Sequence, residues 1–279
     1  MKYRHSFHAG NFADVMKHVA LTAVLLRLTE KDRPLFVLDT HAGRGRYEIG
    51  GASEAGRGIH RLASATPPEA SAAIARYLEI VRSLNAGGGA ALQNYPGSPL
   101  IAASLIRAQD RAAFCELSPV EADALRREFR SDARIGVHCR DGFEALGALL
   151  PPAEKRGLAL IDPPYEEQEQ DLARVADALV AAASRWPQGV LMAWYPIKQG
   201  VVAARLHRRL LDAGIRRLLV AELCIHPDDS RAGLNGSGLA TINPPWQFEQ
   251  DLRLALPWLH GLLAEGGAGR TRVALLADE

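Results

Sequence analysis

The clearest chemical signal in the chain is a short apolar run that ends in an acid, two prolines and an aromatic residue. Residues 158–161 are all apolar, which is typical of a fully buried strand, and Asp162-Pro-Pro-Tyr165 follows directly. Open α/β sheets bind ligands outside the carboxyl ends of their strands, so Asp162 stands where a functional acid is expected. The prolines stiffen the backbone beside Asp162, which predicts one fixed orientation for its carboxylate.

This motif suits the activation of an exocyclic amine on a purine base. Such an amine is a poor nucleophile because its lone pair is delocalised into the ring. The Asp162 carboxylate and the Pro163 carbonyl can both accept hydrogen bonds from the amine and stabilise the positive charge that develops as it attacks a methyl donor. Tyr165 offers a flat face for an unstacked base. The alternative is an ordinary Pro-Pro turn with a tyrosine on the surface.

A second predicted strand, over residues 35–40, leads into a glycine turn that suits a nucleotide-like ligand. Asp39 ends this strand, and Gly43-Arg-Gly45 lets a ligand approach the backbone closely. A dinucleotide fingerprint would have a third glycine where Glu48 stands, and an acid about twenty residues further on, which is much nearer than Glu116. An acid before such a turn instead suits a ligand with an ammonium group and no pyrophosphate, such as S-adenosylmethionine.

Two more predicted strands end in acids. Glu116 follows the strand over 111–117 and could hold both hydroxyls of a ribose. Asp141-Gly142 follows the strand over 135–139 and could meet the edge of an adenine. Asp141 is equally well suited to cap the helix that begins at Gly142, and the residues alone leave both roles open.

Strands and helices alternate along most of the chain, which predicts an α/β fold. Asn11 is predicted to cap a helix over 12–30 that packs on the sheet, with Lys17 and His18 on its polar side. Asn243-Pro-Pro-Trp246 resembles the acidic motif but has an amide in place of the acid, and we interpret it as a structural turn. Strands are predicted at 35–40, 111–117, 135–139, 158–161, 190–195, 217–224, 239–242 and 272–276.

Residues 48–95 contain more than a minimal strand-helix-strand connection needs. Ile74, Leu78 and Val81 follow helical spacing within a helix predicted over 68–83. We therefore expect a small inserted helical subdomain at 48–95, between the two parts of a main domain at 1–47 and 96–279. Residues 1–11 form a polar tail near the predicted site.

Composition sets broad limits on the partners of the protein. The 279 residues are 48% hydrophobic and 23% charged, with a net charge of +1, as expected for an ordinary globular chain. A nucleic acid would therefore have to meet a local basic patch. Five arginines near the predicted site could form one, or could simply be solvated: Arg4, Arg44, Arg46, Arg57 and Arg61.

Cysteine and histidine usage indicates a reducing compartment and no metal. The three cysteines have no paired spacing, and neither a signal segment nor a run of transmembrane length is present, so we expect a cytoplasmic protein without a membrane partner. His5, His8 and His18 cluster near the amino terminus, but no cysteine or carboxylate arrangement completes a metal site.

The motifs in this order resemble class I S-adenosylmethionine-dependent adenine-N6 methyltransferases. The order is Asp39-x-His-x-Gly-x-Gly, then Glu116, Asp141 and Asp162-Pro-Pro-Tyr165. Longer runs at 3–11, 38–47, 95–99 and 242–246 resemble the RlmJ family of bacterial 23S ribosomal RNA adenine-N6 methyltransferases over essentially the whole length. Phe12 departs from the pattern, because many relatives are expected to have histidine there.

The resemblance implies a Rossmann-like, seven-stranded mixed sheet with an inserted helical subdomain, in a monomer that acts on naked 23S ribosomal RNA or an early assembly intermediate. Asp162 would be the catalytic acceptor, and S-adenosylmethionine would be converted to S-adenosylhomocysteine. Tyr3 would help to hold the RNA or close over the site, and we expect Arg4 beside it to bind the substrate as well. The residues expected around the methyl donor are His18, Asp39, His41, Gly43, Gly45, Ser98, Glu116, Asp141 and Gly142.

Two other functions are consistent with the same motifs. A DNA adenine methyltransferase shares Asp162-Pro-Pro-Tyr165 but needs a target-recognition domain, and residues 48–95 are short for that purpose. A non-catalytic RNA-binding relative would not need an intact motif. The residues themselves do not distinguish RNA from DNA.

Overall fold

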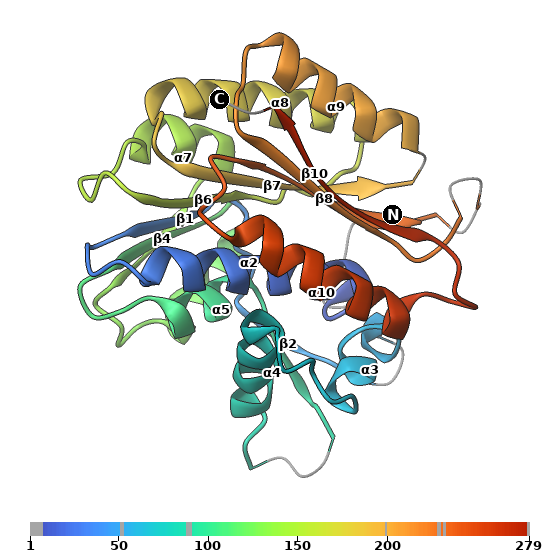
Figure 1. The fold of residues 1–279 in the computed structure, drawn as a ribbon. Helices are drawn as coiled ribbons and strands as arrows, with labels where there is room; N and C mark the ends of the chain where they lie inside the picture. The colour runs from blue at the N-terminus through green and yellow to red at the C-terminus, as the bar shows by residue number, and fades with distance from the viewer. Residues whose placement is uncertain are drawn as a thin grey trace.

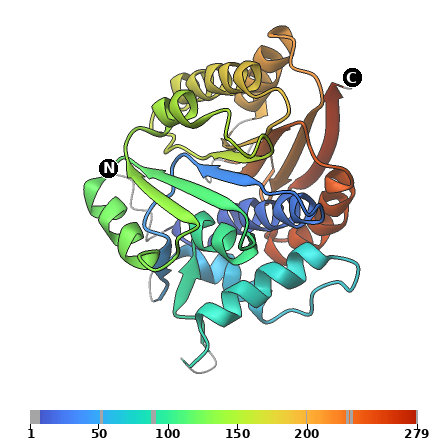
Figure 2. The ribbon, with the colours of Figure 1, turned by 90° about the vertical axis from the view of Figure 1, so that its left-hand side faces the viewer.

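The centre of the molecule is a mixed sheet with helices on both faces (Figure 1, Figure 2). The computed structural model describes residues 8–50, 53–87, 91–198, 200–227, 230 and 233–277. Within these residues the sheet has eight strands in the order β10-β8-β9-β7-β6-β1-β4-β5. The strands are β1 (Phe36–Asp39), β4 (Arg111–Glu116), β5 (Ile135–Cys139), β6 (Gly157–Ile161), β7 (Val190–Ile197), β8 (Leu218–Cys224), β9 (Gly236–Ile242) and β10 (Arg270–Ala277).

The sheet confirms the predicted α/β class and corrects one detail. All eight strands predicted from the residue pattern are present, whereas the family resemblance implied seven. The eighth, β10, pairs antiparallel with β8 and forms one edge of the sheet. Strands β5, β4, β1, β6 and β7 are parallel, and β9 runs antiparallel to β7 and β8.

The strand order places the predicted acids at one edge. The chain leaves β1 to form strands on both of its sides, β4 on one and β6 on the other. The carboxyl ends of these three strands carry Asp39, Glu116 and Asp162. Such a switch point is where open α/β sheets bind ligands, because the connecting loops diverge there.

Two apolar clusters, one on each face, explain the continuous apolar runs of the central strands. Alternate side chains of β1 face opposite sides, with Val37 in one cluster and Leu38 in the other. The first cluster includes side chains of α2 (Phe12–Thr29), α5 (Ser98–Leu105), α6 (Pro119–Glu128) and α10 (Phe248–Leu263). The second includes side chains of α7 (Gly142–Leu149), α8 (Gln168–Arg185) and α9 (Gly200–Asp212). Because both faces are covered, the central strands need no polar side.

Helix α2 is the element that brings basic side chains to the switch point. It begins after Asn11, as predicted, because the Asn11 side chain accepts hydrogen bonds from the N–H groups of Ala13 and Asp14, both at 3.0 Å. Most of the helix is buried, including Lys17 and His18. The predicted polar side of α2 therefore faces the interior of the protein and not solvent.

The segment between Glu48 and Asn94 is closed by a small antiparallel pair, β2 (Arg46–Glu48) with β3 (Asn94–Pro96). It carries a short 3-10 helix (Glu54–Arg57), α3 (Ile59–Ala63) and α4 (Ala72–Leu84). The predicted apolar stripe of α4 is buried and belongs to the same cluster as α2. The helices thus share the main core, and the treatment of 48–95 as a separate subdomain stays a prediction.

The turn after β9 has a structural role, as the sequence indicated. Asn243 adopts φ 54° and donates from Nδ2 to the carbonyls of Pro187 at 2.8 Å and Gly189 at 3.0 Å. Because β9 is antiparallel, this turn lies at the edge of the sheet opposite Asp162. Trp246 is 84% exposed and contributes nothing to the core.

Candidate functional site

A narrow cleft lies at the carboxyl ends of β1 and β6. Four of the predicted site residues line it, namely His18, His41, Ser98 and Asp162. They come from α2, the loop after β1, the start of α5 and the loop after β6. The complete lining is Ala9, Asp14, Lys17, His18, His41, Ala42, Tyr47, Gly97, Ser98 and Asp162.

The centre of the cleft is an ion-pair network that the sequence did not predict. Lys17 Nζ contacts Asp162 Oδ2 and lies 2.9 Å from Asp14 Oδ1. Burial alone would lower the pKa of Lys17, but the two carboxylates raise it well above its usual value, so this 8% exposed lysine stays charged. Burial raises the pKa of Asp14, but Lys17 and His18 outweigh it and lower this pKa to about 2.

Lys17 also fixes the carboxylate of Asp162. It holds Oδ2, while Oδ1 has no hydrogen-bond partner among the residues that the structure describes. The side chain of Asp162 is 12% exposed, so the carboxylate is accessible from the cleft. One oxygen is therefore anchored and the other is available to a ligand, which is the arrangement that a hydrogen-bond acceptor for a substrate amine requires.

Asp39 ends β1, is almost fully buried, with 1% of its surface exposed, and is not among the residues that line the cleft. Its Oδ1 accepts a hydrogen bond from the His41 N–H at 3.2 Å, and Oδ2 makes no hydrogen bond of normal geometry within the described chain. Burial raises the pKa of Asp39 to about 7, and the nearby Ser98 side chain only partly offsets this effect. A buried carboxylate with an unpaired oxygen favours a cationic ligand group.

The loop after β1 is shaped by glycine and holds Glu116. Gly43 adopts φ +62°, and a Cβ there would lie 2.1 Å from the Tyr47 hydroxyl, so a larger residue would be strained and would have to displace the Tyr47 ring. The Gly43 N–H donates to Glu116 Oε2 at 2.9 Å, and the Ser118 N–H donates to Oε1 at 2.7 Å. These bonds orient the carboxylate while each oxygen keeps a lone pair for ligand hydroxyls.

Asp141 caps α7, one of the two roles that the sequence left open. Its Oδ1 accepts from the N–H groups of Phe143 at 2.7 Å and Glu144 at 3.2 Å, and its Oδ2 pairs with Arg174 at 3.1 Å. These contacts lower the pKa of Asp141 against the effect of burial. A contact between this segment and an adenine edge stays a prediction.

An aromatic pair flanks Asp162. The Tyr165 hydroxyl donates to the Trp194 carbonyl, and the two ring centroids lie 5.5 Å apart at 64°. Burial, and then the charge of Asp162, raises the pKa of Tyr165 well above its usual value. Trp194 also lies under Lys17, whose Nζ is 5.8 Å from the ring centroid. The sequence carried one signal for Trp194, an aromatic residue near the carboxyl end of the strand beside β6.

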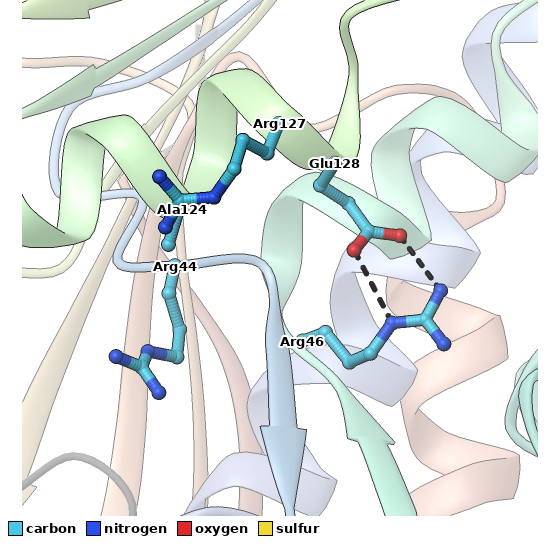
Figure 3. A pocket seen from close by; sticks show the side chains of 5 residues that line it. All are labelled: Arg44, Arg46, Ala124, Arg127 and Glu128. Carbon is cyan, nitrogen blue, oxygen red and sulfur yellow. Dashed lines mark hydrogen bonds and ion pairs between the residues drawn. The ribbon is translucent and has the colours of Figure 1, made fainter.

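Four of the five arginines of the predicted basic patch lie within the described residues. Tyr3 and Arg4 lie outside the described residues. The four other arginines each have an intramolecular partner: Arg44 pairs with Glu121, Arg46 with Glu128, Arg57 with Glu265, and Arg61 with the carbonyls of Leu262 and Leu263. Figure 3 shows a second hollow, lined by Arg44, Arg46, Ala124, Arg127 and Glu128, in which a phosphate would compete with these carboxylates.

Two of the predicted histidines have separate partners. His8 Nδ1 lies 2.8 Å from Glu54 Oε2, and His18 Nδ1 lies 2.7 Å from the Tyr95 hydroxyl. His5 is outside the described residues.

In the described ranges, no helix combines the length and apolar character needed to cross a bilayer.

Comparison with known proteins gives the same family over the whole chain. The model of the family described as "Ribosomal RNA large subunit methyltransferase D, RlmJ" matches residues 32–276. Two relatives named "Ribosomal RNA large subunit methyltransferase J", from Escherichia coli and Haemophilus influenzae, are each 41% identical, with 100% of both chains covered. A crystal structure of a Legionella pneumophila protein superimposes with a TM-score of 0.87 at 34% identity, covering 96% of this chain and 98% of that chain.

The alignment with the relatives leaves no large part of either chain uncovered, so the similarity is not confined to a shared cofactor-binding fold. The chain belongs to the RlmJ family of ribosomal RNA large subunit methyltransferases.

Proposed function

We propose that this protein transfers a methyl group from S-adenosylmethionine to the exocyclic N6 of one adenine in protein-free 23S ribosomal RNA. The observation that carries the proposal is the Asp162 carboxylate on the wall of the cleft, anchored by Lys17 at Oδ2 and without a hydrogen-bond partner at Oδ1 among the described residues. The names of the relatives support a ribosomal RNA substrate. The choice of 23S RNA, the N6 atom and a cytoplasmic monomer rests on the family resemblance.

The residues around the cleft fit S-adenosylmethionine. The unpaired Asp39 Oδ2 suits the ammonium group of the methionine portion, and the Glu116 carboxylate suits ribose hydroxyls. His18, His41 and Ser98 line the cleft together with Asp162. When bound, S-adenosylmethionine supplies an electrophilic methyl group and leaves as S-adenosylhomocysteine.

Asp162 would act on the target amine by accepting its hydrogen bond at Oδ1, together with the carbonyl of Pro163. Both acceptors stabilise the positive charge that grows on N6, and their fixed geometry avoids reorganisation during the reaction. Lys17 prevents rotation of the carboxylate by holding Oδ2. After the transfer, N6 carries the positive charge and is acidic enough to lose one proton to water. The reaction thus depends on alignment more than on a strong base.

Tyr165 would provide the stacking surface for the adenine after it leaves its RNA stack. Its hydroxyl is bonded to the Trp194 carbonyl, so the ring has little freedom to rotate. Stacking of a base on an aromatic side chain contributes about 1–3 kcal/mol, which offsets part of the cost of extruding the base. Tyr3 and Arg4 would contact the RNA from the amino-terminal tail.

The proposal is tested by methyl transfer from labelled donor to two substrates, a protein-free 23S ribosomal RNA transcript and duplex DNA. We expect label in the RNA, at N6 of a single adenine identified by mass mapping of nuclease fragments. Label in DNA alone would instead support the DNA adenine methyltransferase reading. Failure to bind the donor in calorimetry would support a non-catalytic RNA-binding protein.

A further inference from the structure

Three buried polar side chains connect the cleft with the helix of the 48–95 segment. His18 on α2 lies with Nδ1 2.7 Å from the hydroxyl of Tyr95 on β3, and this hydroxyl lies 2.9 Å from the hydroxyl of Tyr77 on α4. All three residues are almost fully buried. The rings of His18 and Tyr95 are also stacked, with centroids 5.5 Å apart at 29°.

The direction of the hydrogen bonds between His18, Tyr95 and Tyr77 follows from counting their protons. Tyr77 has one hydroxyl proton and, among the described residues, one partner, the Tyr95 hydroxyl. If His18 donated from Nδ1 to Tyr95, and Tyr95 to Tyr77, the buried Tyr77 proton would have no acceptor. A buried hydrogen-bond donor without an acceptor is unfavourable, because its lost hydration is not replaced. In the opposite direction Tyr77 donates to Tyr95 and Tyr95 donates to His18 Nδ1, so both buried hydroxyl protons have an acceptor.

This direction fixes where the proton of a neutral His18 lies. Burial lowers the pKa of His18 to about 3, and the neighbouring charge of Lys17 acts in the same sense, so the ring is neutral near pH 7. With Nδ1 accepting from Tyr95, the ring proton is on Nε2. Nε2 has no protein partner among the described residues and is not fully enclosed, and the ring lines the cleft.

We propose that Tyr95, supported by Tyr77, is a positioning residue that holds His18 with its proton on Nε2, so that the ring donates to the carboxylate of the bound methyl donor. The inference rests on the proposed function, because it concerns how the same cleft holds its donor. A neutral histidine ring is suited to donate this hydrogen bond, since a protonated ring would be a second cation beside Lys17 and would be repelled. Through Tyr77, helix α4 would thus help to orient a side chain of the cleft.

The proton position is tested in the donor-free protein by nitrogen-15 NMR of the histidine rings, which distinguishes a protonated from an unprotonated ring nitrogen. His18 is assigned by the signal lost in His18→Ala. We expect an unprotonated Nδ1 that accepts a hydrogen bond, with the proton on Nε2. A proton on Nδ1 in the wild-type protein would overturn the proposal whether or not any variant folds.

The functional consequence is tested by calorimetry with S-adenosylhomocysteine on Tyr95→Phe and on its matched control Tyr77→Phe. Each substitution removes one buried hydroxyl from the same core. For Tyr95→Phe we expect Kd and the donor KM to rise about tenfold with kcat unchanged, because His18 loses its anchoring bond. For Tyr77→Phe we expect a change of about twofold or less, because the Tyr95 hydroxyl still has His18 Nδ1 as its acceptor.

A double-mutant cycle separates positioning from general loss of structure. In the His18→Ala background, Tyr95→Phe should cause no further loss of donor affinity. Equal effects of the two tyrosine substitutions, or additive losses in the cycle, would overturn the proposal. If the wild-type protein binds neither S-adenosylmethionine nor S-adenosylhomocysteine, the proposed function fails, whereas the NMR result still decides the position of the proton.

Discussion

The raised pKa of Asp39 predicts that donor binding depends on pH near neutrality. Asp39 is buried and has a pKa of about 7 in the donor-free protein, so about half of it is protonated at that pH. An ammonium group bound beside Oδ2 requires the ionised form. Below pH 7 most molecules of the donor-free protein carry a proton on Asp39, and this proton has to be released when the ligand binds. We therefore expect Kd for S-adenosylhomocysteine to rise about tenfold between pH 7 and pH 5.5.

The same shift has a consequence for folding, with a sign that differs from that of a salt-bridged acid. The pKa of Asp39 is higher in the folded than in the unfolded chain, where it is close to 3.8. The folded state therefore loses stability as the pH rises from about 4 to about 7, and the loss then stays constant. Replacement by asparagine should raise the free energy of unfolding at pH 8 by up to about 4 kcal/mol.

Calorimetry and urea unfolding of Asp39→Asn at pH 5.5, 7 and 8 provide the assay. The variant should bind the donor more weakly than the wild type at pH 7, without the tenfold change below pH 7. The comparison also separates the contribution of Asp39 to the pH dependence of binding from those of His41 and of the ligand's amino group, because the latter two are present in both experiments. Identical pH dependence in the two proteins, or a variant less stable than the wild type at pH 8, would show that Asp39 does not titrate near pH 7.

Three further substitutions test other parts of the site and its support. Lys17→Met should lower the free energy of unfolding at pH 7 by about 3–5 kcal/mol, because Asp14 and Asp162 lose their shared cation, and the difference should narrow as the pH falls towards 2; urea titrations measure both. Gly43→Ala should weaken donor binding at least tenfold in calorimetry, since its Cβ would clash with the Tyr47 hydroxyl at a positive φ; unchanged affinity would show that the loop adapts. Asn11→Ala should cost about 1 kcal/mol in urea unfolding by removing the cap of α2, and no cost would mean that the cap is redundant.

The strands and the acids at their ends were predictable from the sequence because they depend on local pattern. A buried parallel strand is a short apolar run, and the residue that follows it lies at the carboxyl edge of the sheet. Asp39, Glu116 and Asp162 were found in this way, and the structure brings them to one edge. The cap of α2 at Asn11 was equally local.

The pairing of Lys17 with Asp162 was not predictable from the sequence. The two residues are 145 positions apart, and their contact depends on how α2 packs across the sheet. Periodicity placed Lys17 on a polar face, which would ordinarily be solvated, and burial reversed that expectation. The raised pKa of Asp39 has the same origin, since it results from burial by other elements.

The basic patch shows the opposite limitation. Arginines close together in the sequence suggested a surface for phosphates, but α6 brings glutamates to two of them. Ion pairs between residues that are far apart in the sequence cannot be predicted from local sequence patterns. The salt dependence of RNA binding is therefore a property to be measured, and the tail with Arg4 remains part of the prediction.

The role of Asp162 as the acceptor of the target amine is tested most directly by single-turnover methyl transfer to the 23S ribosomal RNA transcript by Asp162→Asn, with Asp14→Asn as the matched control. Both substitutions remove one negative charge beside Lys17, but only Asp162 is proposed to accept the target amine. We predict that Asp162→Asn binds the donor within about twofold of the wild type and transfers methyl groups slower by a factor on the order of hundreds. A transfer rate equal to that of the wild type, or equal losses in both variants, would show that Asp162 does not accept the target amine.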